Sequence, residues 1–249
     1  SFTASAATTA FTGAITAGST SGADTEIHVI DSAAGAPALQ KITGLVGTST
    51  NRIGLIAIGE DDGKAGALEF DTDVHATAMT ITSNGGTDED SYVNFDNAAD
   101  ITTITLDDDG VGLSLLKLTT ATAKTLTGTI DGAQVNEGTL VVAAATKTIA
   151  GNVGSTLDLL LVNIDATAIF NGDVSAQGLN IAASVTSTFK KDITAGTDKN
   201  VVVGTMALTG TTAQTISGVI SGAATTGAIT VSNAAGATFA DEVGGLIAS

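Results

Sequence analysis

"AIFNGDVSAQGLNIAAS", residues 168–184, contains two short apolar segments separated by a turn of asparagine, glycine and aspartate. Phe170 and Val174 flank this turn, and Leu179 and Ile181 form the second apolar segment. Side chains alternate across an extended chain, so we expect these four residues to point inward. The turn between the first two is expected to form an outward corner. The stretch therefore predicts short β-strands joined at a corner.

The same spacing recurs along the chain: a large apolar residue, a turn residue two positions later and a β-branched residue four positions later. Phe11 and Phe70 begin two early copies. From residue 126 onward the large apolar positions, or anchors, are Leu126, Ile149, Phe170, Phe189, Ile216 and Phe239. Successive anchors are 23, 21, 19, 27 and 23 residues apart, which indicates a period of about 22. A second apolar segment lies between or after anchors, at residues 140–142, 159–161, 179–181, 201–203 and 229–231.

A repeat of this length predicts an all-β protein, a parallel β-solenoid or β-helix with about 22 residues per coil. One repeat cannot bury its apolar side chains alone, whereas stacked repeats form a continuous core. Threonine, valine and isoleucine suit stacked strands, and a single proline suits a chain made mostly of strand ladders. The alternative is a β-sandwich or jelly roll, which also has short, regularly spaced strands. Such folds usually contain more aromatic residues than the 3% found here.

The chain divides into two regions that differ in charge and regularity. Residues 1–110 carry 17 acidic and 3 basic side chains, whereas residues 111–249 carry 9 and 6. The second region holds the regular repeats. The first is expected to be an acidic, less regular β region, formed either by solenoid coils with loop insertions or by a separate small β domain. Within it we predict strands at residues 25–30 and 52–59, and acidic loops at 59–70 and 83–91.

Three acidic clusters are candidate metal ligands. Calcium prefers several oxygen ligands from flexible loops, and each cluster lies close to glycine. Neither EF-hand spacing nor the repeated G-G-x-G-x-D pattern of calcium-binding β-rolls is present. The sequence therefore predicts solvated acidic loops and no cofactor, with a bound calcium ion as the alternative. The candidate ligands are Glu60, Asp61, Asp62, Asp88, Asp90, Asp107, Asp108 and Asp109.

Catalytic and nucleic-acid functions find little support. Paired carboxylates can cleave polysaccharides, but sugar-binding clefts generally need aromatic and basic residues. Here Tyr92 is the only tyrosine, and tryptophan is absent. A formal net charge of −17 disfavours nucleic-acid binding. His28, within "EIHVI", is expected at a solvent-facing strand position. We therefore expect a protein that is not an enzyme.

The sequence also excludes several covalent and membrane features. Cysteine is absent, which rules out disulfides and thiolate metal sites. No run of about 18 apolar residues predicts a transmembrane helix. Because the chain begins with Ser1 and shows no signal-peptide pattern, we expect a processed mature chain or a fragment.

The segments "IFNGDVSAQGLNIAAS", "KTIAGNVGSTLDLLLVN" and "QTISGVISGAATTGAITVSNA" resemble repeats of bacterial autotransporter passengers. They are equally similar to repeats of S-layer, adhesin and phage-fibre proteins. The resemblance covers roughly residues 120–245, with weaker copies at 8–18 and 68–81. It implies a secreted, repetitive β-solenoid that builds a stalk, sheath or filament.

We therefore expect an extracellular structural protein that self-assembles into a filament, sheath or surface layer, with further copies of itself as its partner. The alternative is an adhesin or viral fibre module that binds a cell-surface or glycan receptor through acidic loops in residues 1–110. Both hypotheses place the protein outside the cell, either secreted or on a cell or virion surface.

Overall fold

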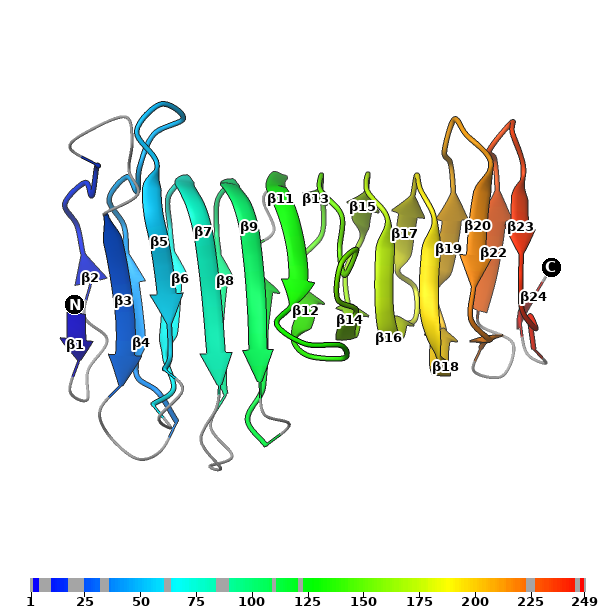
Figure 1. The fold of residues 1–249 in the computed structure, drawn as a ribbon. Helices are drawn as coiled ribbons and strands as arrows, with labels where there is room; N and C mark the ends of the chain where they lie inside the picture. The colour runs from blue at the N-terminus through cyan, green and yellow to red at the C-terminus, as the bar shows by residue number, and fades with distance from the viewer. Residues whose placement is uncertain are drawn as a thin grey trace.

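The computed structural model describes residues 2–4, 10–17, 25–31, 36–60, 64–83, 90–108, 111–120, 123–222, 227–244 and 247–248. These residues form strands and turns, without a helix, and every ladder between neighbouring strands is parallel. The coils stack side by side along one axis, from the N-terminus at one end to the C-terminus at the other (Figure 1). This is the predicted parallel β-solenoid. The described residues also include no helix able to cross a membrane.

Strands of two sheets alternate along the chain. The first sheet contains, in spatial order, β1 (Phe2–Ala4), β3 (Glu26–Asp31), β5 (Ile53–Ile58), β7 (Val74–Ser83), β9 (Ala99–Asp108), β11 (Lys124–Gly132), β13 (Lys147–Ile149), β15 (Ala168–Phe170), β17 (Thr186–Phe189), β19 (Thr205–Leu208), β22 (Gly227–Val231) and β24 (Ile247–Ala248). The second contains β2 (Ala10–Phe11), β4 (Leu39–Ile42), β6 (Ala67–Phe70), β8 (Ser91–Phe95), β10 (Ser114–Leu118), β12 (Thr139–Val142), β14 (Leu159–Ile164), β16 (Val174–Ile181), β18 (Ile193–Val202), β20 (Gln214–Ser217) and β23 (Ala237–Phe239), with β21 (Ile220–Ser221) paired to β18.

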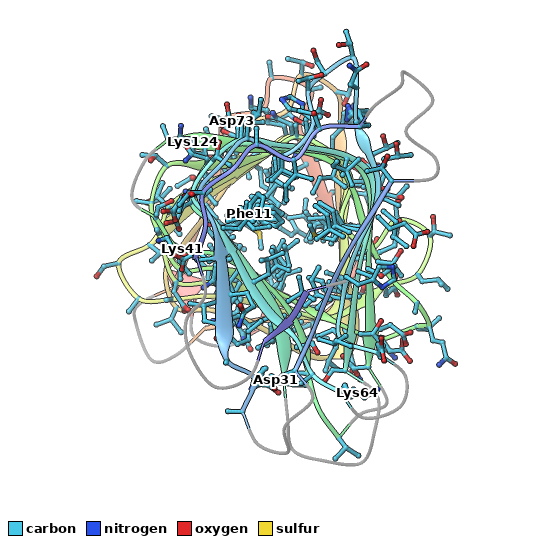
Figure 2. The ribbon with its side chains drawn as sticks, turned by 90° about the vertical axis from the view of Figure 1, so that its left-hand side faces the viewer. Phe11, Asp31, Lys41, Lys64, Asp73 and Lys124 are labelled. Carbon is cyan, nitrogen blue, oxygen red and sulfur yellow. The ribbon has the colours of Figure 1, made fainter. Side chains whose placement is uncertain are left out.

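A thin apolar core runs along the axis of the solenoid. Strand residues alternate between buried and accessible positions, and the buried ones form one continuous cluster from Ile27 to Ile220. Viewed along the axis, Phe11 points into this interior, whereas Lys41 and Asp73 lie at the periphery (Figure 2). Aromatic rings stack between adjacent coils, with centroids 5.4 Å apart for Phe70 and Phe95 and 5.0 Å apart for Phe170 and Phe189.

The register confirms part of the predicted stacking and corrects the rest. Leu126, Ile149, Phe170 and Phe189 pair in succession, as expected. The next partner of Phe189 is Leu208, and not the predicted anchor Ile216. Ile216 instead pairs with Ile193, and Phe239 pairs with Ile216. The error arose because β19 supplies an additional strand within the 27-residue interval between the predicted anchors.

The five-residue anchor motif marks corners, and the solenoid uses it at more than one of them. Phe70 pairs with Phe95 in the second sheet, whereas Phe170 pairs with Phe189 in the first. Ile216 pairs with neither Phe70 and Phe95 nor Phe170 and Phe189. The spacing in the sequence therefore predicts that a corner is present, but it does not show which corner of the coil the motif forms.

Glycine allows close contact between coils at one corner. Gly128 has a φ of 112°, a conformation that side chains rarely adopt. A Cβ added to Gly151 would lie 1.9 Å from the carbonyl oxygen of Gly128, and one added to Gly172 would lie 2.4 Å from that of Gly151. These three glycines, one per coil, let the backbones approach more closely than a side chain would permit.

The acidic N-terminal region contains more strand than the sequence predicted. Strands at residues 25–30 and 52–59 are confirmed as β3 and β5. The segment 59–70, expected to be a loop, includes β6, because Leu68 and Phe70 are buried apolar residues at alternating positions. Both sheets continue across residue 110, so the division there is one of charge and sequence regularity.

Candidate functional site

The register brings the predicted acidic segments to one edge of the solenoid. Ile58 in β5 pairs with Ile81 in β7, and Ser83 at the end of β7 pairs with Asp108 at the end of β9. The segments that follow these strands therefore leave successive coils at the same edge. Four candidate ligands in them, Asp61, Asp62, Asp88 and Asp109, lie outside the described residues.

The described members of this acidic edge have structural partners. Glu60 forms an ion pair with Lys64 at 3.1 Å. The side chain of Asp90 accepts a hydrogen bond from the backbone N–H of Leu113 at 3.0 Å. The first contact joins the two ends of one loop, and the second joins the segments before β8 and β10.

Asp108 is almost fully buried and accepts a hydrogen bond from the backbone N–H of Gly138 at 2.9 Å. The backbone carbonyl of neighbouring Asp107 accepts one from the Ser114 hydroxyl at 2.5 Å. No group of three metal-ligating side chains forms among the described residues of this edge. Calcium binding here remains a prediction.

Glu137 extends the acidic edge into the next coil. It is buried, and its two carboxylate oxygens accept hydrogen bonds from the backbone N–H and the side-chain amide of Gln134, at 3.0 and 2.9 Å. Burial raises the pKa of Glu137, and the charges of Asp107 and Asp108 raise it further. Sequence reasoning missed this residue because it lies almost 30 positions after those aspartates.

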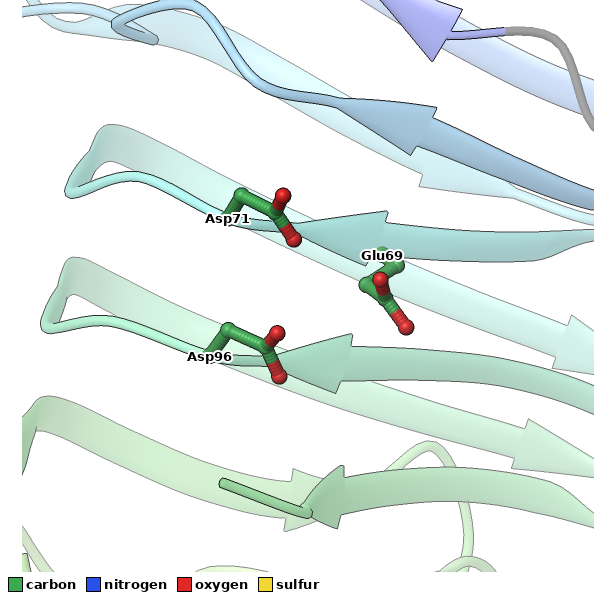
Figure 3. A group of neighbouring side chains, drawn as sticks. All are labelled: Glu69, Asp71 and Asp96. Atoms are coloured by element: carbon green, nitrogen blue, oxygen red, sulfur yellow. The ribbon is translucent and has the colours of Figure 1, made fainter. Parts of the chain in front are cut away.

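A second acidic group brings together three residues that were not among the predicted ligands. Glu69, Asp71 and Asp96 each offer a carboxylate oxygen within 4.8 Å of the others (Figure 3). Glu69 lies in β6, and the two aspartates directly follow β6 and β8. Both aspartates belong to Phe-Asp dipeptides 25 residues apart, at Phe70 and Phe95. That repeated dipeptide was the signal that could have revealed the group.

Lys41, from the preceding coil, neutralises part of this acidic group. Its ammonium nitrogen lies 2.7 Å from Glu69 Oε1 and 2.7 Å from Asp71 Oδ1. Hydrogen bonds to Asp71 and Glu69 raise the pKa of Lys41, so that it stays protonated. The lysine thus supplies the positive charge that a bound cation would otherwise provide. The geometry is that of an ion-paired network across three coils.

The pKa of Asp96 is also shifted by its surroundings. Burial raises the pKa of Asp96, and the charges of Glu69 and Asp71 add to the shift, while Lys41 counteracts it. The Thr119 hydroxyl donates a hydrogen bond to its carboxylate at 3.4 Å. Asp96 therefore binds its proton more readily than an isolated aspartate.

Lys147 is a buried lysine close to this network. Only 2% of its surface is exposed, and its ammonium group donates a hydrogen bond to the Thr120 hydroxyl at 3.2 Å. Burial lowers the pKa of Lys147, and the charge of Asp96 partly opposes this effect. The sequence offered no signal for its burial, because the adjacent residues of "TKT" are polar.

Arg52 connects non-adjacent coils by reaching over His75 to Asp100. Its guanidinium forms two charge-assisted hydrogen bonds to the Asp100 carboxylate, at 2.8 and 2.6 Å. His75 Nδ1 lies 3.3 Å from the same carboxylate. His28, in contrast, is solvent-facing as predicted: it alternates along β3 with buried Ile27 and Val29, and its ring contacts Glu26 on the accessible face. Both histidines therefore lie beside a carboxylate at accessible strand positions.

Comparisons with known proteins do not assign this chain to a family. No family model, no curated protein and no solved structure matches the chain.

Proposed function

We propose that the protein is an extracellular structural protein whose solenoid self-assembles into a filament, sheath or surface layer. The observation that carries this proposal is the parallel stacking of the described strands, a pattern that a strand from a further copy can continue. The outermost described strands, β1 and β2 on one side and β23 and β24 on the other, have one described strand partner each. Unpaired N–H and C=O groups on the edge of a sheet can pair with a strand of another molecule.

The geometry of the edges favours continued growth. A contact between opposite ends of two copies uses different surfaces on each, and such head-to-tail contacts produce filaments when they do not close into a ring. Because all ladders are parallel, a second copy can continue the stack at the ordinary strand spacing of about 4.8 Å. The resemblance to autotransporter, S-layer, adhesin and phage-fibre repeats supports a secreted or surface location. The proposed role is non-catalytic.

Electron microscopy and light scattering of the purified chain at rising concentration test this proposal. We expect rods whose length increases with concentration; a strictly monomeric particle would contradict it. The backbone N–H of Ala240 donates to Ile216, so alternation places the N–H of Ala237 toward the outer edge of β23. Ala237→Pro removes that donor and should shorten the rods, whereas Ala237→Ser should not. Thermal unfolding checks that both variants fold.

The register also supports a second candidate function, an adhesin or fibre module that binds a receptor through the acidic edge. Segments near Glu60, Asp90 and Asp107 leave neighbouring coils on the same side, which would present them together to a partner. Removing residues 59–91 would delete β6 and β7, so charge neutralisation in the full chain is the sharper test.

Receptor binding is tested by replacing Asp61, Asp62, Asp88 and Glu89 with the corresponding amides. The proposal expects reduced attachment to target cells or glycans, with unchanged rod formation. Attachment equal to that of the wild type would contradict it. Repeating the assay with and without added calcium shows whether a cation mediates the contact.

A further inference from the structure

The C-terminal coils present an outer surface that is rich in threonine and free of ionisable side chains. It consists of the accessible positions of β13, β15, β17, β19 and β22, together with the residues just before β13 and β15. We name it the threonine face. Its ten residues are Thr146, Thr148, Thr167, Ile169, Thr186, Thr188, Thr205, Ala207, Ala228 and Thr230.

The threonine face is a regular two-column array. One column follows the register pairs from Thr148 through Thr188 to Thr230, and the other runs through Thr186 and Thr205. Neighbouring residues of a column belong to adjacent coils, whose strands lie about 4.8 Å apart. In β13, β15, β17 and β19 buried residues alternate with them, so this part of the array stands on the packed core.

This neutrality is significant in a chain with a formal net charge of −17. Two copies repel each other wherever their carboxylates are brought together. On the threonine face, hydroxyl and methyl groups can meet without opposing like charges. The face is therefore a surface through which a second copy can approach closely.

Charged residues flank the threonine face at both of its corners. Lys190 and Lys191, both exposed, lie at the corner that follows it, and no ion pair within the described part of the chain includes them. Asp173 and Asp192 lie at the same corner, and their carboxylates accept hydrogen bonds from backbone N–H groups of the next coils. Asp165, also exposed, lies at the corner that precedes the face.

We propose that the threonine face packs against the threonine face of a second copy, related by a twofold axis parallel to the solenoid axis. This orientation reverses the strand direction, so Lys190 and Lys191 face the corner that carries Asp165 of the partner subunit. A twofold axis along the strands would instead place the lysine corners together. The inference rests on the proposed self-assembly and specifies its lateral contact.

The size of the face makes this contact weak in isolation. Its five strands span only about 20 Å along the axis. A stable interface usually buries about 800 Å² on each partner. The contact recurs along a filament, because the chosen axis keeps both solenoids pointing in the same direction. Repetition then strengthens lateral pairing without any additional type of contact.

The test compares aspartate substitutions on two faces. Thr188→Asp places a carboxylate in the threonine face, whereas Thr194→Asp places one at an exposed position of β18, outside that face. Electron microscopy and chemical cross-linking report lateral pairing, and thermal unfolding confirms folding. We expect Thr188→Asp to leave single filaments and Thr194→Asp to pair like the wild type. Filaments of Thr188→Asp that still pair would overturn the inference.

Charge reversal tests the orientation. The double substitution K190E/K191E should reduce the paired fraction severalfold, and adding Asp165→Lys should restore it. Failure of Asp165→Lys to restore pairing would overturn the proposed axis.

The experiment separates this inference from the proposed end-to-end assembly. Lateral dimers that are sensitive to Thr188→Asp but never elongate would retain the inference and contradict filament formation. Long wild-type filaments without lateral contacts would support filament formation and contradict the inference. Unpaired protein that binds an insoluble neutral polysaccharide, with loss of binding in Thr188→Asp, would also overturn the inference by showing another occupant of the face.

Discussion

Phe170 and Asp173 lie three residues apart and show how differently inward and corner positions contribute to stability. Phe170 is fully buried and stacks on Phe189, with ring centroids 5.0 Å apart. Asp173 lies at a corner, where its backbone N–H donates to Asn152 and its carboxylate accepts from the N–H of Asp192. The phenylalanine supports the core, whereas the aspartate acts through a hydrogen-bonding oxygen that asparagine also possesses.

We therefore predict that Phe170→Asp destabilises the fold by at least about 3 kcal/mol, since it buries an unpaired charge. Asp173→Asn should change the free energy of unfolding by less than about 0.5 kcal/mol, because the amide retains the acceptor. Urea unfolding measures both. Similar losses in the two variants would contradict the assignment of inward and corner positions.

Glu137 makes the stability of the fold depend on pH. Because burial raises its pKa in the folded state, the folded protein binds this proton more tightly than the unfolded chain does. Stability should therefore fall as pH rises from the ordinary glutamate pKa to the raised value. Glu137→Gln removes this dependence while keeping a carbonyl acceptor for Gln134.

The expected result is a stability advantage of Glu137→Gln that appears as pH rises through this window. Urea unfolding at several pH values between about 4 and 7 measures it. Glu26→Gln, at an exposed strand position, is the control. An advantage that is equal at all pH values would refute the role assigned to Glu137.

At the scale of elements, corners determine how closely successive coils approach. The sequence correctly indicated a turn at the centre of each anchor motif, as in "FNGDV" at residues 170–174. It did not show that glycines of adjacent coils lie over one another. Close contact between Gly128, Gly151 and Gly172 depends on the register, which only the stacked strands define.

Gly151→Ala should destabilise the solenoid by about 1–3 kcal/mol, because the new methyl group would lie 1.9 Å from the carbonyl oxygen of Gly128. Gly244→Ala is the matched control, since the nearest atom to its added Cβ is 3.6 Å away. Thermal or urea unfolding compares them. Equal stability of the two variants would show that the corner can relax at little cost.

At the scale of the whole molecule, charge is distributed unevenly along a stack of coils that contact mainly their neighbours. Residues 1–110 carry 17 of the 26 acidic side chains. In a repeat architecture, each coil's stability depends mainly on itself and on its neighbours. Repulsion should therefore weaken the N-terminal coils more than the C-terminal ones.

We predict that salt protects the N-terminal coils selectively. The screening length falls from about 10 Å at 0.1 M salt to about 3 Å at 1 M, which reduces repulsion between carboxylates on adjacent coils. Hydrogen exchange should slow more in β5, β7 and β9 than in β13, β15 and β17. A uniform response along the chain would contradict a local electrostatic cause.

The acidic groups illustrate what can be predicted without coordinates. The candidates near Glu60, Asp90 and Asp107 were recognised because each cluster is contiguous in sequence. The group of Glu69, Asp71 and Asp96 was missed because its members are brought together only by the pairing of β6 with β8. Its neutralising partner Lys41 comes from the preceding coil, so its role depends on the register as well.

The sequence by itself determined the all-β class, the parallel solenoid, the inward position of residues such as Phe170 and the presence of corners. These properties follow from local alternation and from a repeated spacing, which are visible along one strand. Only the tertiary structure decided that Leu208 succeeds Phe189, that Lys147 is buried and that the threonines form one face. The physical reason is that hydrogen bonding between coils sets the register, and coil length varies too much for the sequence to specify it.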